Sequence, residues 1–509
     1  MTLWPLLSLA VFAPWAGAGL LALVPRAPAA ISRTIALLSS LSTLLAGFAV
    51  FASFDAKTAG YQFVERHTWV SALHSHYYLG VDGLSLILVF LTGIVAPAAL
   101  LASWRQTREP RLFGILFLIL QGCALGVFLA LDFFHWFLFW ELSLIPAFFL
   151  IKLWGGSGAS RAAYQFVIYT LAGSVFLLLG FAALFAATGS LDFVELSRLA
   201  ASGTLGVRLA ALGGFWPKAV FLGVFAGLAV KVPLFPFHTW LPPAYAEAPV
   251  GVSMFLTGVM SKMGVYGFLR ILWPIFPASI HSAATPLLWL ALGGAVLGAL
   301  AALRQDDLKR MVAYSSLNHV SYCLLALFAV AAGPLKSAGT ASALSGAILQ
   351  MFNHGISASA LFLCVGVLED RGGGRRGIGD FGGVRSAAPL FAGLCGIAMF
   401  SSIGLPGLNG FVGEFLIFRG VFALAPWAAA TACLGLLITA VFYLTFWQRV
   451  FHGPRSGAAA GAFSDIAGPE LAALGSLVAL MFLFGIAPQL PVGIFNPLVT
   501  AWAGGMPSP

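Results

Sequence analysis

Long apolar stretches, separated by short polar segments, recur from one end of the chain to the other. A helix that crosses the hydrocarbon core of a bilayer needs about 20 predominantly apolar residues, and Gly, Pro and charged residues mark where such helices end. The pattern predicts an all-α polytopic membrane protein with about 14 transmembrane helices. The predicted spans lie near residues 3–24, 31–53, 80–103, 112–131, 133–153, 162–187, 218–242, 249–272, 285–303, 311–332, 341–367, 387–422, 427–451 and 471–488.

The polar segments between these spans are short. The longest, near 54–79 and 188–217, are too small to enclose a hydrophobic core, so no soluble domain is expected. The first span follows five residues without Lys or Arg, and no small-residue cleavage site closes it. We therefore expect a retained helix and not a cleaved signal peptide.

Composition supports this class, because 60% of the 509 residues are hydrophobic and 8% are charged, whereas soluble domains carry about 25% charged residues. A soluble cytoplasmic enzyme is excluded. The net charge of +9 does not indicate nucleic-acid binding, because Lys and Arg occupy short segments between apolar runs. Of the 26 cations, 16 fall in loops after odd-numbered spans and 8, Arg270 among them, in loops after even-numbered spans. The positive-inside rule then places both termini on the outer side.

Familiar catalytic and cofactor motifs are absent from the sequence. The five Cys lie in apolar runs without a CxxC or a Cys/His cluster, so neither disulfides nor a metal site is predicted. A G-x-G-x-x-G match at Gly377, Gly379 and Gly382 follows a membrane helix and not a strand, which favours a flexible cytoplasmic turn over a nucleotide site. No Walker A, HExxH or GxSxG sequence occurs, so ATPase, protease and esterase chemistry is not expected.

Titratable side chains inside the spans carry the functional information. A charge at the centre of a span costs about 2.5–3.5 kcal/mol on insertion scales, so each needs a reason. For any one charge that reason could be a structural ion pair or snorkelling, and for a single histidine an interior hydrogen bond. Two acids, two lysines and two histidines over six spans instead favour a proton path. These candidate relay residues are Glu141, Lys231, Lys262, His319, His354 and Glu414.

Two spans contain helix breakers beside a buried charge. Pro233 and Pro236 follow Lys231 in the seventh span, and Gly404-Leu-Pro-Gly precedes Glu414 in the twelfth. Prolines remove helix donors, and the freed carbonyls could solvate an ammonium group or a water molecule. Broken helices at corresponding places indicate an inverted-repeat transporter. The predicted parts are helices 1–3 (1–110), a first five-helix repeat (111–272), a second (285–451), and helix 14 with the tail (452–509).

Placement of these residues suggests a mechanism. A lysine in a low-dielectric cavity binds its proton weakly, and a nearby carboxylate restores that binding. We therefore expect Glu141 and Lys231 to act as a switch that releases a proton toward Lys262. The histidines would relay it, with bridging waters, and Glu414 would deliver it to the far side.

At these residues the chain resembles the antiporter-like proton-channel subunits of respiratory complex I (NADH-quinone oxidoreductase) and of multi-subunit cation/proton antiporters. The resemblance covers about residues 110–450. A glutamate in Gly-Phe-Val-Gly-Glu414 is similar to the subunit M branch (chain 4 in mitochondrial naming), whereas the sister subunits usually carry lysine there. The matching stretches are Phe139-Trp140-Glu141-Leu142, Lys231 to Pro242, Glu247-Ala-Pro249, Leu308 to Ser316 and Gly404-Leu-Pro-Gly407.

The resemblance implies a proton-translocating membrane-arm subunit of NADH-quinone oxidoreductase in a bacterial inner membrane. NADH, FMN, iron–sulfur clusters and quinone would be bound by partner subunits, with no cofactor or metal in this chain. Sister antiporter-like subunits and lipid would be its partners, and nucleic acid would not. Glu141, Lys231, Lys262, His319, His354 and Glu414 would take the relay roles inferred above.

Other functions are weighed against this one. A cation/proton antiporter subunit or a related proton-pumping hydrogenase subunit is the main alternative, and Glu414 in place of lysine argues against the antiporter. A non-conducting membrane scaffold fits least, given the insertion cost of the buried charges. Two details differ from a simple relay: Asn318 stands where the family often has serine, and Asp132 and His135 are interpreted as interfacial snorkelling residues.

Overall fold

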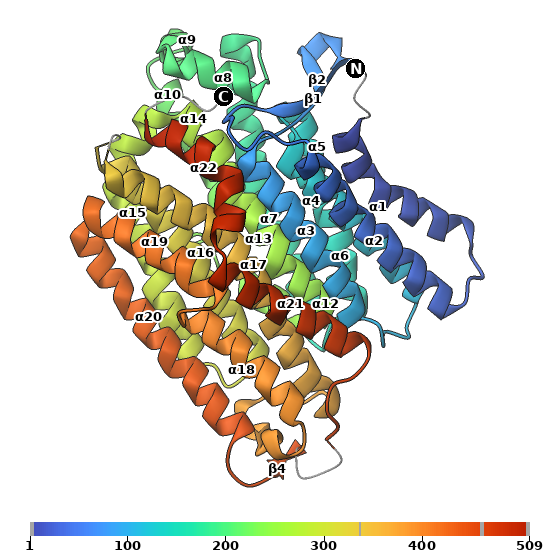
Figure 1. Cartoon of the computed structure of the whole chain (residues 1–509). Coiled ribbons are helices and arrows are strands. Elements are labelled where there is room, and N and C mark those ends of the chain that lie inside the picture. Colours follow the sequence, from blue (N-terminus) through green and yellow to red (C-terminus); the bar gives the residue numbers. More distant parts are fainter. Residues whose placement is uncertain (1–4, 335–336, 459–462, 505–509) are drawn as a thin grey trace.

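The computed structural model describes residues 5–334, 337–458 and 463–504. Most of the described chain forms helices that run between two ends of the molecule (Figure 1). One end carries the hairpin of β1 (Gln62–Val70) and β2 (Ser75–Val81), and we call it the hairpin end. The opposite end carries the short pair β3 (Phe381–Gly382) and β4 (Ser456–Gly457), and we call it the Arg376 end after a residue described below.

In the first half, the seventh and eighth membrane-spanning helices are each built from several segments. In chain order, the helices of this half are α1 (Leu6–Leu23), α2 (Ala29–Ala52), α3 (Gly83–Ala102), α4 (Pro110–Leu129), α5 (Phe133–Leu142), α6 (Leu144–Trp154), α7 (Ala159–Thr188), α10 (Trp216–Lys231), α11 (Leu241–Glu247), α12 (Val250–Phe255), the π-helix η2 (Leu256–Met260), α13 (Ser261–Gly267), the π-helix η3 (Phe268–Leu272) and α14 (Trp273–Ile275). The seventh membrane-spanning helix consists of α10 and α11, and the eighth consists of α12 to α14.

The second half contains fewer but longer helices. They are α15 (Pro277–Leu303), α16 (Leu308–Ala332), α17 (Ala338–Arg371), α18 (Pro389–Ile403), α19 (Asn409–Leu424), α20 (Pro426–Phe446) with the π-helix η6 (Trp447–Phe451), α21 (Pro469–Ile486) and α22 (Gln489–Ala503). Short elements join them, namely η1 (Ser71–Leu73), α8 (Phe193–Ala201), α9 (Thr204–Ala211), η4 (Ile378–Asp380) and η5 (Val384–Ser386).

Helices occupy all fourteen predicted ranges, and the fold class is confirmed. Within the described residues, 12 helices are long and apolar enough to cross a membrane by themselves. The seventh and twelfth predicted spans are the two that do not, because each is broken. α10 ends at Lys231 and α11 begins at Leu241, while α18 ends at Ile403 and α19 begins at Asn409. The breakers beside the buried charges therefore interrupt the helices as predicted.

Asp132 and His135 are buried, so the predicted snorkelling of these side chains is wrong. Asp132 caps α5, where its Oδ1 accepts hydrogen bonds from the backbone N–H groups of Phe134 (3.0 Å) and His135 (3.3 Å). The same carboxylate accepts bonds from the Ser75 hydroxyl (2.8 Å) and the His76 backbone N–H (3.2 Å) of the hairpin. Asp132 thus joins the hairpin to the membrane helices.

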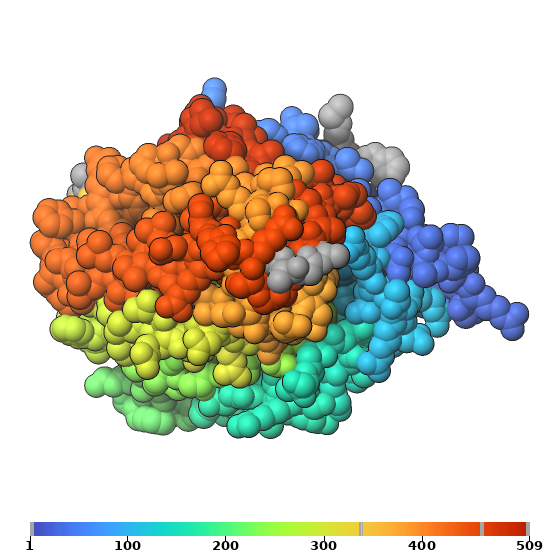
Figure 2. Space-filling model, turned by 90° about the horizontal axis from the view of Figure 1, so that it is seen from below, coloured from blue at the N-terminus to red at the C-terminus, as the bar shows by residue number. Residues whose placement is uncertain are grey.

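Two features lie at the edge of the helix bundle. α1 and α2 project from one side (Figures 1 and 2) and carry exposed apolar side chains such as Leu38 and Leu45. α22 was not predicted as a separate helix. It packs closely on the start of α3, because a Cβ added to Gly83 would lie 2.4 Å from the Ile494 carbonyl oxygen.

Candidate functional site

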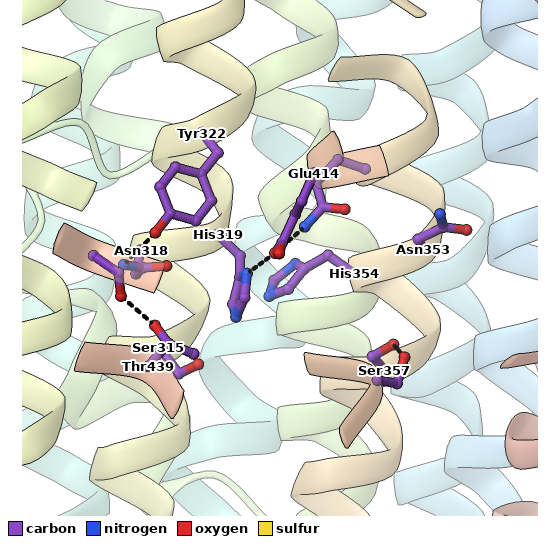
Figure 3. Close-up of polar contacts among 12 residues, drawn as sticks. Ser315, Asn318, His319, Tyr322, Asn353, His354, Ser357, Glu414 and Thr439 are labelled. Carbon is purple, nitrogen blue, oxygen red and sulfur yellow. Dashed lines mark hydrogen bonds and ion pairs between the residues drawn. The ribbon is translucent and has the colours of Figure 1, made fainter. Parts of the chain in front are cut away.

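Buried titratable groups of the second half, His319, His354 and Glu414, lie next to one another (Figure 3). His319 Nδ1 lies 2.7 Å from Glu414 Oε1, and Gln350 Nε2 donates to the same oxygen at 3.1 Å. Glu414 is 5% exposed and His319 2%, so neither side chain is solvated by bulk water. The helices that carry Glu414 and Gln350 approach closely because Gly413 has no side chain: a Cβ there would lie 2.6 Å from Gln350 Oε1.

The titratable groups continue from His319 to Lys262. The rings of His319 and His354 lie 5.3 Å apart between centroids, and His354 Nδ1 lies 2.8 Å from Lys262 Nζ. The Lys262 ammonium also donates to the Thr257 carbonyl oxygen (2.6 Å) and the Ser261 hydroxyl (3.2 Å). Since a lysine ammonium has only donors, His354 Nδ1 accepts when Lys262 is protonated. Four of the six predicted relay residues therefore form one contiguous chain.

Lys231 lies beside this chain but does not touch it directly. A small cavity of about 10 Å³, lined by Lys231, Ser261, Trp240, Tyr245 and others, separates the two. That volume is about what one water molecule needs on the same measure. Because Ser261 also bonds Lys262, a single water and one hydroxyl are enough to link the two lysines.

The break in the seventh helix sets the position of Lys231. A Cβ on Gly264 would lie 2.7 Å from the Cα of Val232, so the helix carrying Lys262 packs directly on the break. The Val230 carbonyl oxygen accepts a hydrogen bond from Trp240 Nε1 (2.9 Å), so this carbonyl does not solvate the lysine. The Lys231 ammonium has no hydrogen-bond partner among the described residues and lies 4.8 Å from the centre of the Trp140 ring.

Glu141 occupies an outward-facing stripe of the fifth helix. Its neighbours on that stripe, Leu138 and Ile145, are 45% and 54% exposed. Glu141 is half-buried, and its Oε1 has no hydrogen-bond partner among the described residues. No hydrogen bond or ion pair joins it to Lys231 within the described part of the chain. An intramembrane carboxylate of this kind is a candidate functional residue.

Hydroxyl groups lead from Lys262 toward the Arg376 end. Ser253, Thr257 and Ser261 follow one another at four-residue intervals, and the Thr257 hydroxyl lies 2.8 Å from that of Ser316. Below Ser253, a cavity of about 640 Å³ opens at the Arg376 end. Polar groups from both halves line this vestibule, including Glu247, Lys309, Glu369 and Asp370.

A cluster of ion pairs borders the vestibule, with Arg376 at its centre. Arg376 Nη2 bonds Glu247 Oε1 and its Nε bonds Asp307 Oδ2, each at 2.7 Å. Lys309 pairs with Glu369 at 2.6 Å. Sequence reasoning counted these cations only as loop charges. A single sequence does not show that Arg376 pairs with Glu247 and Asp307, because these residues are far apart in the chain.

Electrostatics reinforce the Glu247–Arg376 pair. Burial by itself would raise the pKa of the Glu247 carboxyl, but the Arg376 hydrogen bond, the Gly158 N–H (2.9 Å) and the nearby cations together lower it. The loop with the G-x-G-x-x-G match is held on both sides, because Leu308 N–H bonds the Arg376 carbonyl and Ile378 N–H bonds that of Asp306.

Arg270 was also assigned to a loop, and that assignment is wrong. It is 1% exposed inside η3, where Nη2 bonds both carboxylate oxygens of Asp82 at 2.7 Å. Arg270 lies next to the end of the predicted eighth span at residue 272, and the sequence does not show its acidic partner because Asp82 is 188 positions away in the chain. The described residues contain no group of three or more His, Cys, Asp or Glu placed to hold a metal ion.

Comparisons with known proteins agree with this geometry. Residues 130–439 match the family described as NADH:quinone oxidoreductase/Mrp antiporter, TM. NADH-quinone oxidoreductase subunit M of Rhodobacter capsulatus is 37% identical over 97% of this chain and 95% of its own. A chain of respiratory complex I from Thermus thermophilus with bound NADH superposes with a TM-score of 0.84 at 30% identity, covering 98% of this chain and 99% of that one. A chain of the Mrp complex from Dietzia sp. DQ12-45-1b has the same fold, with a TM-score of 0.82 at 20% identity over 99% and 98%.

Proposed function

The chain belongs to the NADH:quinone oxidoreductase/Mrp antiporter transmembrane family, and from this premise we propose how it moves protons. It is an antiporter-like, proton-translocating subunit of the membrane arm of NADH:quinone oxidoreductase. Partner subunits bind NADH, FMN, iron–sulfur clusters and quinone, and this chain supplies no redox centre. The single observation that carries the proposal is the contiguous Lys262–His354–His319–Glu414 string.

The proton route begins at Lys231. Its ammonium, which lies over the Trp140 ring, releases a proton through the one-water cavity and the Ser261 hydroxyl to Lys262. Lys262 passes it to His354 Nδ1. His354 then transfers a proton from its other ring nitrogen toward His319. The Nε2 atom of His319 has no partner among the described residues and receives this proton through a bridging water molecule. His319 delivers its Nδ1 proton to Glu414.

Control of this route lies at Glu141. When its carboxylate turns toward Lys231, the lysine holds its proton, and when the carboxylate turns away, the proton moves on. The exposed stripe of Leu138, Glu141 and Ile145 supplies the means, because a carboxylate is not stable against lipid. We infer that a sister antiporter-like subunit covers this stripe and offers a charged group to Glu141. Redox work in the partner subunits would reach this chain through that contact.

Membrane orientation follows from the charges. Arg371, Arg376 and Lys309 lie at the Arg376 end, and the buried Arg270 no longer counts among the loop cations of the hairpin end. The positive-inside rule then favours the cytoplasm for the Arg376 end and the outer side for the hairpin end, in a bacterial inner membrane. The two broken helices support the inverted repeat over 111–272 and 285–451.

The test is Glu141→Gln in the whole complex, reconstituted into liposomes. We expect NADH-driven proton uptake per electron to fall, while the amount of assembled complex is unchanged. Glu195→Gln, on α8 at the hairpin end, is the matched control and should pump normally. Unchanged pumping by the Glu141 variant would refute the switch. A purified assembly without flavin and iron would move the function to a cation/proton antiporter, which the same fold also serves.

A further inference from the structure

We propose that the buried Arg270–Asp82 ion pair is a seal that prevents protons on Lys262 from leaving through the hairpin end of the eighth helix. The inference rests on the proton route proposed above and adds a barrier, so that a proton on Lys262 passes to His354 and not along the eighth helix to the hairpin end. Sequence features gave no role to either residue.

Every nitrogen of the Arg270 guanidinium makes at least one hydrogen bond. Arg270 donates from all three nitrogens: Nη2 to both oxygens of Asp82 (2.7 Å each), Nη1 to the Tyr61 hydroxyl (2.7 Å) and Nε to the Tyr266 hydroxyl (3.2 Å). Both charged side chains are 1% exposed. The Asp82 carboxylate also accepts the backbone N–H of Ser85 at 3.0 Å, where it caps α3.

The seal lies between Lys262 and the hairpin end, and Arg270 is on the same helix as Lys262. Lys262, Tyr266 and Arg270 follow at four-residue intervals, and eight residues span about 12 Å along a helix. Tyr266 is the one hydroxyl between the two charges on this face. It accepts from Arg270 and donates to the Phe128 carbonyl oxygen at 3.0 Å, so its proton is bonded to that carbonyl and not to Lys262.

Chemistry makes this cluster a poor proton conductor. A relay group must accept a proton as well as release one, whereas a guanidinium has no acceptor and keeps its proton in proteins. A fixed arginine can exclude protons from a pore for the same reason. Every nitrogen of Arg270 and both oxygens of Asp82 already have a hydrogen-bond partner within the cluster.

The proposed relay differs in this respect. Along it, buried side-chain atoms without a partner occur repeatedly among the described residues, and each can take a water. These atoms are Glu141 Oε1, Lys231 Nζ, His319 Nε2 and Gln350 Oε1. No atom of Arg270, Asp82, Tyr61 or Tyr266 is among the unpartnered ones. Atoms that can bind a water therefore follow the route from Lys231 to Glu414. The atoms between Lys262 and the hairpin end already have partners, and they block that exit.

The experiment compares two neutral replacements of the ion pair in the complete complex. Asp82→Ser with Arg270→Ser leaves space that water can fill, whereas Asp82→Leu with Arg270→Met leaves an apolar plug. Neither pair leaves a buried charge without its partner. The complex is reconstituted into liposomes, a potassium diffusion potential is imposed with valinomycin, and proton entry is measured without NADH. We expect the serine pair to leak at least several-fold faster than wild type and the apolar pair to remain tight.

Controls connect the leak to Lys262. Adding Lys262→Met to the serine pair should return the leak to the wild-type rate. Should the serine pair not assemble, Asp82→Asn with Arg270→Gln is closer in size and should show a smaller leak with the same dependence on Lys262. Equal proton entry in the serine and apolar pairs, or a leak that survives Lys262→Met, would overturn the seal. The leak is measured without pumping, so normal pumping by the Glu141→Gln variant would count against the proposed function alone.

Discussion

Replacing Arg376 by methionine should destabilise the protein more than any change at a neighbouring cation. Arg376 connects Glu247, at the end of the broken seventh helix, to Asp307, at the start of α16. Glu247 is 6% exposed. Arg376→Met therefore leaves a carboxylate buried with one remaining hydrogen bond, from the Gly158 N–H.

These contacts set the loss of unfolding free energy expected for Arg376→Met. Breaking a buried ion pair by removing one partner costs about 3–5 kcal/mol, and the remaining Gly158 bond places this case at the lower end. The Asp307 side chain is 22% exposed, and an exposed pair adds about 0–1 kcal/mol. A chain of 509 residues unfolds with an entropy of about 1 kcal/mol/K, so a loss of about 3 kcal/mol lowers the midpoint by about 3 °C.

The assay is thermal unfolding of the complex in mild detergent. Arg375→Met is the matched control, because Arg375 is adjacent, exposed and without an ion pair among the described residues. Its midpoint should not change. Adding Glu247→Gln to Arg376→Met removes the unpaired charge and should recover more than half of the loss. Equal midpoints for the two arginine variants would refute the reasoning.

Three further outcomes are expected. Lys262→Arg keeps the buried charge but cannot release its proton, so NADH-driven pumping should stop while the complex still assembles, and normal pumping would exclude Lys262 from the route. Because the folded pKa of Glu247 is lowered, its contribution to stability is present above its unfolded pKa of about 4.3 and is lost as pH falls through the lower folded value; Glu247→Gln should flatten the dependence of the melting midpoint on pH over that range. Trp140→Leu removes the ring over Lys231, a contact of about 2 kcal/mol when desolvated, and should slow pumping more than Trp140→Phe, with equal rates in the two variants contradicting a role for the ring.

Much of the fold could be predicted because hydrophobicity and helix breakers act locally. Runs of apolar residues marked all the spans, and Pro233 and Pro406 marked the two breaks beside Lys231 and Glu414. α22 could not be found in the same way. It is amphipathic and short, and its position depends on contact with Gly83, far away in the sequence.

The candidate site was predicted by residue type but not by contact. The cost of burying a charge singled out Lys262, His354, His319 and Glu414, and their contiguity appears only in the structure. Arg270 was missed because it lies near the end of a span, where a cation normally reaches water. Its true environment depends on Asp82, and pairing across 188 positions leaves no local signature.

Two π-helical turns flank Lys262, so the direction of its side chain depends on the number of residues in the eighth helix as well as on their identity. A π turn contains one residue more than an α turn of the same hydrogen-bonded ladder, and η2 and η3 lie on either side of the segment that carries Lys262. Deleting one residue from Leu256–Met260 lets this segment close as an α turn, and later side chains keep their directions. Deleting one residue from the α-helical segment α12, with η2 kept, would instead rotate every later side chain by about 100°. The ammonium would then leave His354, which is held on a different helix. A deletion in α12 therefore redirects the proton route without replacing any charged residue.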